Sequence, residues 1–67
     1  MDNFLSRDNA KVGATLRFRG KRYVIDEVGG VGVWMRRARK DGTPRKDAQH
    51  RDFIYFHEAE TFGVTVE

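Results

Sequence analysis

Hydrophobic and polar side chains alternate in several short stretches of the chain, and this alternation predicts β-strands rather than helices. The clearest stretch is residues 14–19, where Leu16 and Phe18 point to one side and Arg17 and Arg19 to the other. It is followed by a two-residue break, Gly20-Lys21, which predicts a type II′ hairpin turn with Gly20 at its first central position.

In the rest of the chain, short strand-like stretches are separated by turn residues, as is typical of a compact all-β protein. Four more strands are predicted, at residues 22–28, 31–39, 51–57 and 62–66. Consecutive glycines end the second strand, and a glycine inside the third, Gly32, predicts a bulge or a close approach of another backbone. Residues 57–61 predict one short helical turn before the last strand, and residues 2–8 permit another.

The alternation also predicts which side chains form the core. Residues 53–56 are an exception to the alternation, because four consecutive apolar side chains require a strand that is covered at least partly on both faces. The predicted core is Leu16, Phe18, Tyr23, Ile25, Val28, Val33, Met35, Phe53, Tyr55, Phe62, Val64 and Val66.

Several spacings resemble those of the SH3-like small barrels, which include Tudor, KOW, chromo-barrel and retroviral-integrase-type C-terminal domains. The resemblance covers residues 12–66. Its residues are Val12-Gly13, Leu16-x-Phe18-x-Gly20-x-x-Tyr23-x-Ile25, and Phe56-His57-Glu58-Ala59-Glu60 before Phe62-Gly63-Val64. It implies a five-stranded barrel domain at residues 12–67 behind an N-terminal segment at 1–11. The arginine-rich third strand departs from SH3 domains that bind proline-rich peptides, which puts peptide recognition in doubt.

Length and composition exclude several classes of protein. The 67 residues allow one domain, and the absence of cysteine excludes disulfides, cysteine-based zinc sites and a thiol nucleophile. This composition agrees with a reducing compartment, and no apolar run or leader-like start is visible, so a cytoplasmic protein is expected.

Catalysis is not expected from this sequence. The single serine, Ser6, is far in sequence from His50 and His57, so no nucleophile–base pair is indicated. The two histidines and their acidic neighbours do not have the spacing of a metal site. No glycine-rich phosphate loop is present, so no cofactor is expected either.

Charge is distributed unevenly along the chain. Residues 7–46 carry twelve Lys or Arg against four Asp or Glu, a net charge of +8, whereas residues 47–67 carry a net charge of −4. A basic surface attracts polyanions, so we expect a non-catalytic module that binds DNA or RNA through phosphates. The residues predicted to bind nucleic acid are Arg17, Arg19, Lys21, Arg22, Trp34, Arg36, Arg37, Arg39 and Lys40.

Blander interpretations of these residues stay open. Trp34 and Tyr23 are candidate stacking platforms for bases, but each can equally belong to the core, and residues 36–40 can be a solvated strand end. Two other functions also fit a small basic chain. One is a phage- or mobile-element-type accessory protein that binds to an acidic surface of a host protein, or inhibits that protein. The other is a homo-oligomer, such as a dimer, in which the basic part of one subunit faces the acidic part of another.

Overall fold

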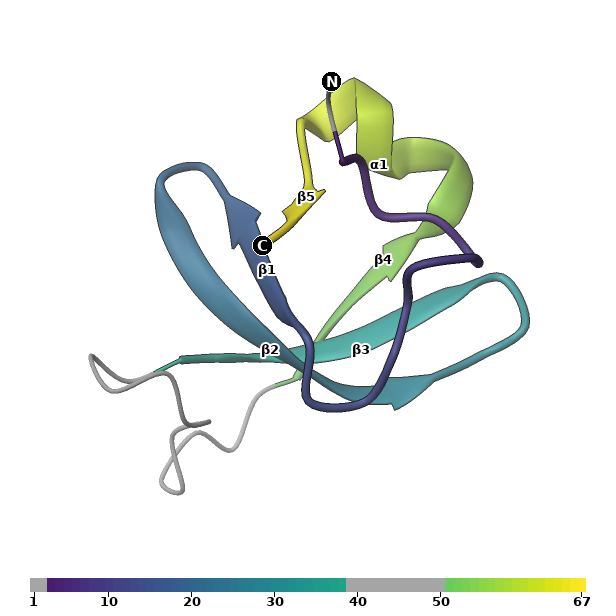
Figure 1. Cartoon of the computed structure of the whole chain (residues 1–67), viewed down its shortest axis with the longest axis horizontal. Coiled ribbons are helices and arrows are strands. Elements are labelled where there is room, and N and C mark those ends of the chain that lie inside the picture. The colour runs from purple at the N-terminus through teal and green to yellow at the C-terminus, as the bar shows by residue number, and fades with distance from the viewer. Residues whose placement is uncertain (1–2, 39–50) are drawn as a thin grey trace.

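The computed structural model describes residues 3–38 and 51–67, which form one five-stranded antiparallel sheet and one short helix (Figure 1). The sheet has the order β4-β3-β2-β1-β5. Its elements are β1 (Thr15–Phe18), β2 (Lys21–Val28), β3 (Gly32–Arg37), β4 (Asp52–Tyr55), α1 (Phe56–Phe62) and β5 (Thr65–Val66). The predicted all-β architecture with five strands and a helix before the last strand is confirmed.

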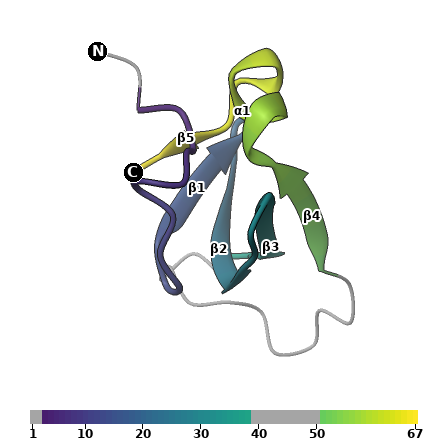
Figure 2. The same ribbon diagram turned by 90° about the vertical axis from the view of Figure 1, so that its right-hand side faces the viewer.

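The sheet is curled into a half-barrel. Seen from the side, β1 and β2 lie on one side and β4 on the other, and α1 lies over the end between them (Figure 2). The helix is longer than the single turn predicted and begins one residue earlier, at Phe56. It ends at Phe62 and is capped by Gly63, whose φ of 70° is the left-handed conformation that glycine adopts without a steric penalty.

The turn between β1 and β2 lies one residue earlier than predicted. Phe18 is paired with Lys21, so the central turn residues are Arg19 and Gly20 rather than Gly20 and Lys21. Both have positive φ, 53° and 76°, as a type I′ turn requires. The prediction that Arg19 continues the alternation of β1 was therefore wrong, because Arg19 lies in the turn and not in the strand.

A β-bulge interrupts the pairing of β2 with β3. Ile25 is paired with Met35 and Glu27 with Trp34, so Asp26 is the extra residue between them. A bulge reorients the side chain of the inserted residue. Gly32, by contrast, is at a close approach, since a Cβ atom built there would lie 2.8 Å from Cζ of Phe53 and closer still to the backbone of β4.

The core fills the concave side of the sheet, which we call the inner face. Its buried apolar residues are Leu5, Leu16, Ile25, Val33, Met35, Ile54, Ala59 and Val64, whereas Val24, which is also buried, is directly opposite Arg36 and lies on the other face of the sheet. Three residues predicted to be in the core are exposed instead: Val28 (38%), Tyr55 (43%) and Phe62 (44%). In β4, Ile54 is buried opposite Val33, so its neighbour Tyr55 points to the other face, while Val28 and Phe62 are the last residues of their elements.

The N-terminal segment is extended along the edge of β5 rather than helical over its described residues. The N–H of Leu5 donates to Val64 O (2.9 Å), and the N–H of Val66 donates to Asn3 O (2.8 Å). Asn9 then closes a turn, because its Oδ1 accepts from the N–H of Ser6 and its Nδ2 donates to Phe4 O. These bonds satisfy the backbone that a helical turn would otherwise have paired.

Candidate nucleic-acid interface

The β1–β2–β3 meander brings most of the predicted basic residues into one part of the sheet. Arg17 is directly opposite Arg22, Arg36 is opposite Val24, and Arg37 is opposite Tyr23. Residues directly opposite each other point to the same face of a sheet. The cations therefore divide between the two faces of the sheet instead of lying on one surface. Arg39 and Lys40 lie outside the described residues.

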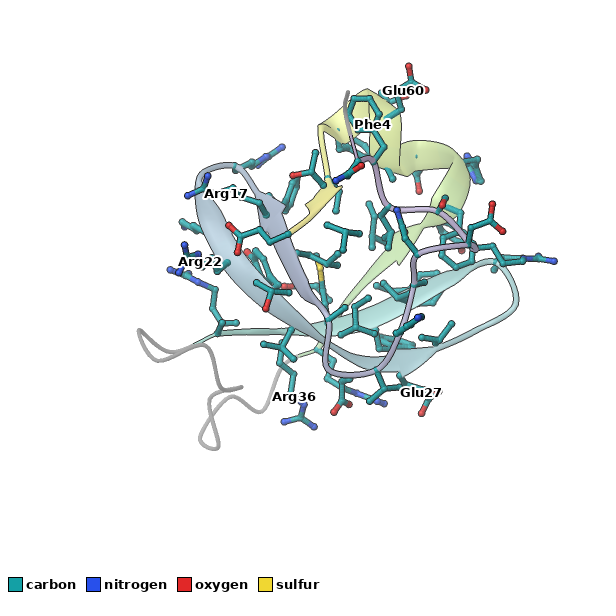
Figure 3. All side chains as sticks on the ribbon, viewed as in Figure 1. Phe4, Arg17, Arg22, Glu27, Arg36 and Glu60 are labelled. Carbon is teal, nitrogen blue, oxygen red and sulfur yellow. The ribbon has the colours of Figure 1, made fainter. Side chains whose placement is uncertain are left out.

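Arg17, Arg22 and Arg36 lie on the convex, outer face of the sheet, and each is beside a carboxylate. Nε of Arg17 and Nε of Arg22 are 3.5 and 3.4 Å from the two carboxylate oxygens of Glu67. Nε of Arg36 is 3.5 Å from Oδ2 of Asp26. Figure 3 shows Arg17 and Arg22 projecting from the β1–β2 hairpin, and Arg36 well away from them.

The inner-face residues at the turn end of the β1–β2 hairpin are different. Lys21 is opposite Phe18, and Arg37 is opposite Tyr23, with its guanidinium 5.9 Å from the ring centroid. From the turn, Arg19 places its guanidinium 5.1 Å from the centroid of Phe18. The two rings are half-buried neighbours, 6.2 Å apart. We call these five residues the rim cluster: Phe18, Arg19, Lys21, Tyr23 and Arg37.

Among the described residues, no carboxylate forms an ion pair with Arg19, Lys21 or Arg37. The arginines at the rim are instead placed over aromatic faces, which attract cations without neutralising their charge. The rim cluster thus concentrates three positive charges, whereas Arg17 and Arg22 share the carboxylate of Glu67, and Arg36 lies beside that of Asp26.

Asp26 is the electrostatic centre of the outer face. The guanidinium of Arg51 donates to its Oδ2 at 3.0 Å, and this hydrogen bond is the main reason that the pKa of Asp26 lies below its usual value. Partial burial works in the opposite direction, and the charge of Arg36 adds to the lowering. The bulge explains this position, because it places Asp26 between Arg36 of β3 and Arg51, the residue before β4.

An aromatic row crosses the outer face of β3 and β4, and only its first member, Trp34, was predicted as a site residue. Trp34 and Phe53 pack edge to face with ring centroids 4.9 Å apart, as do Phe53 and Tyr55, and His57 lies 5.3 Å from Tyr55. Arg51 covers Trp34 at 4.8 Å. Trp34 is half-buried within this row and lies outside the core. The row follows from Ile54 pointing inward, which turns Phe53 and Tyr55 outward, so the prediction that Phe53 belongs to the core was wrong.

The described residues bear on two other kinds of site. No group of three His, Asp or Glu side chains in the described ranges is placed to hold a metal ion. No helix in the described part of the chain has the length and apolar character that crossing a membrane requires.

In comparisons with known proteins, no family model matches the chain, and neither a curated protein nor a solved structure matches it.

Proposed function

We propose that this protein is a non-catalytic nucleic-acid-binding module, built as an SH3-like barrel, that contacts phosphates through the rim cluster. One observation carries the proposal. Arg19, Lys21 and Arg37 gather around two aromatic rings at the end of the hairpin, with no described carboxylate beside them.

The strand order and the helix before the last strand support the barrel part of the proposal. The sheet curls into a half-barrel with α1 over the end between β1 and β4 (Figure 2), and a curled five-stranded sheet is the basis of a partly open small barrel. The hairpin end remains open to the ligand, because Arg19 and Lys21 are both exposed.

The stacked arginines suit a phosphate ligand. A guanidinium lying over a ring keeps its N–H groups at the edge of the plane, where they are free to donate to phosphate oxygens. Stacking also restricts the side chain, which reduces the entropy lost on binding. Each phosphate that a cation neutralises releases a counterion, so binding weakens steeply as salt increases.

A pair of double variants with the same change in net charge tests the proposal. Lys21→Gln with Arg37→Gln removes two rim charges, and Arg17→Gln with Arg22→Gln removes two outer-face charges. Binding to labelled oligo(dT), duplex DNA and a structured RNA is measured by fluorescence anisotropy at several salt concentrations. We expect the rim variant to lose about tenfold or more in affinity at low salt, and the outer variant less than about threefold.

The salt dependence supplies the second readout. For the rim variant, the slope of log affinity against log salt becomes shallower by about 0.7–0.9 per lost phosphate contact. Equal losses in the two variants would contradict the assignment of binding to the rim. Failure of the unaltered protein to bind all three probes at low salt would reject nucleic-acid binding altogether.

The aromatic row favours a second function, a protein-interaction module. Tyr55 is 43% exposed and lies in the row with Trp34 and Phe53, and tyrosine and tryptophan are frequent anchors of protein interfaces. Affinity for a protein partner that persists at high salt and is lost in Trp34→Ala would favour this function over nucleic-acid binding.

A further inference from the structure

Two arginines directly face each other on the outer face of the hairpin. Arg17 in β1 is the cross-strand partner of Arg22 in β2, and both belong to the part of the hairpin that projects outward in Figure 3. Like charges directly opposite each other destabilise a sheet. The pairing therefore favours an anion between the two guanidinium groups.

In this structure that anion is the carboxylate of Glu67. One of its oxygens lies 3.5 Å from Nε of Arg17 and the other 3.4 Å from Nε of Arg22. The backbone positions it, because the N–H of Glu67 donates to Thr15 O at 2.9 Å and continues the pairing of β5 with β1. Both arginine side chains are more than half exposed, so the carboxylate is held at the surface and water reaches it.

We infer that the Arg17–Arg22 pair is a second phosphate site, and that Glu67 occupies it as an internal competitor. A phosphodiester group carries the same single negative charge as the carboxylate and also offers two oxygens to two guanidinium groups. Exchanging one anion for the other leaves the charge around the pair unchanged. This inference rests on the proposed function, because it adds a screened phosphate contact to a module whose main contact is the rim cluster.

Occupation by Glu67 lowers the affinity of the pair for a phosphate, since the carboxylate must first move aside. The ion pairs to be broken are exposed, and exposed pairs are weak. A polyanion already bound at the rim therefore displaces Glu67 when the strand reaches across the hairpin. In the unaltered protein the pair contributes little to affinity, and removal of Glu67 exposes its full contribution.

Glu67→Gln tests the inference, with Glu60→Gln as the matched control. Both variants raise the net charge by one, but Glu60 is exposed on α1, away from the arginine pair (Figure 3). With oligo(dT) at low salt, we expect Glu67→Gln to bind about threefold tighter or more, with a log–log salt slope steeper by about 0.7–0.9. Glu60→Gln changes affinity by less than about twofold.

A triple variant attributes the gain to the pair. The tightening caused by Glu67→Gln should disappear when Arg17→Gln and Arg22→Gln are present as well. Equal gains from Glu60→Gln and Glu67→Gln, or a gain that survives in the triple variant, would overturn the inference, because either result points to overall charge alone.

A second measurement separates this inference from the proposed function, because it needs no nucleic acid. Thermal unfolding is followed in sodium phosphate and in sodium chloride of equal ionic strength. Phosphate should raise the Tm of Glu67→Gln relative to chloride by more than it raises the Tm of the unaltered protein, and the triple variant should lose this difference. The same response in all three proteins would overturn the anion site, whereas a selective response without oligonucleotide binding would retain the site and reject the proposed function.

Discussion

The two faces of the same hairpin hold their positive charges in opposite ways. On the outer face, Arg17 and Arg22 share the carboxylate of Glu67, and Arg36 lies beside Asp26. At the inner rim, Arg19 and Arg37 lie over aromatic rings and no described acid accompanies them. A run of arginines in a sequence therefore does not define one basic surface, because strand alternation sends neighbouring residues into different electrostatic surroundings.

The faces also differ in what they contribute to the fold. The inner face carries buried side chains such as Leu16, Ile25 and Met35, which supply the hydrophobic stabilisation. On the outer face of the hairpin, Arg17 and Arg22 form ion pairs between exposed groups, which contribute little to stability. We accordingly expect substitutions on the inner face to affect stability and those on the outer face to affect charge.

The largest expected effect tests this division at two adjacent positions. Leu16 is completely buried and Arg17, its neighbour in β1, is exposed. Leu16→Ala leaves a cavity in the core and should lower the free energy of unfolding by about 2–5 kcal/mol. Arg17→Ala should change it by no more than about 0.5 kcal/mol. Urea unfolding monitored by circular dichroism measures both changes. Similar losses in the free energy of unfolding would show that the inner face does not contribute more to stability than the outer face.

Much of the fold could be predicted from local pattern, because alternation reports which side of a strand is buried. Leu16 and Ile25 were placed correctly by this rule alone. The rule fails where backbone geometry changes the phase. Arg19 continues the sequence pattern of β1 but has the positive φ of a turn residue. The bulge at Asp26 shifts the register of β2 against β3 by one residue. The four consecutive apolar residues at 53–56 show no alternation, so the exposure of Tyr55 could not be predicted.

The candidate site was less predictable because its electrostatics depends on contacts distant in sequence. Arg17 is 50 positions from Glu67, and Asp26 is 25 positions from Arg51. Nothing local indicates that these acids would neutralise outer-face arginines. The rim cluster contains three of the predicted cations, but its boundary follows from the turn at Arg19 and Gly20, which places Lys21 on the inner face.

A smaller effect concerns Arg19, in the turn that joins β1 and β2. Arg19 has a positive φ of 53°, a conformation that asparagine and glycine tolerate better than arginine. Arg19→Asn should therefore raise the free energy of unfolding by about 0.5–1 kcal/mol, while removing one rim charge. Thermal unfolding and oligo(dT) binding are measured together. A more stable protein that binds more weakly is the expected combination, and a loss of stability would contradict the turn geometry.

The smallest expected effect concerns the acid at the centre of the outer face. The hydrogen bond from Arg51 is the main cause of the lowered pKa of Asp26. Because its pKa is lower in the folded protein than its usual value of 3.8, its ionised form stabilises the fold above that pH. This stabilisation is lost as the pH falls from 3.8 through the folded value.

Asp26→Asn removes the charge that titrates, so its effect on stability should depend on pH in the same sense. Tm is measured from neutral to strongly acidic pH for the unaltered protein, for Asp26→Asn and for Glu27→Gln. Glu27 is the adjacent control, because its carboxylate lies 3.9 Å from the same arginine instead of 3.0 Å. The deficit in Tm of Asp26→Asn should be constant at neutral pH and shrink below pH 3.8. A deficit that stays unchanged across the acidic range would show that Asp26 stabilises the bulge through its shape and hydrogen bonding rather than its charge. Ion pairs would then contribute less to the stability of the outer face than the distances between their charged groups indicate.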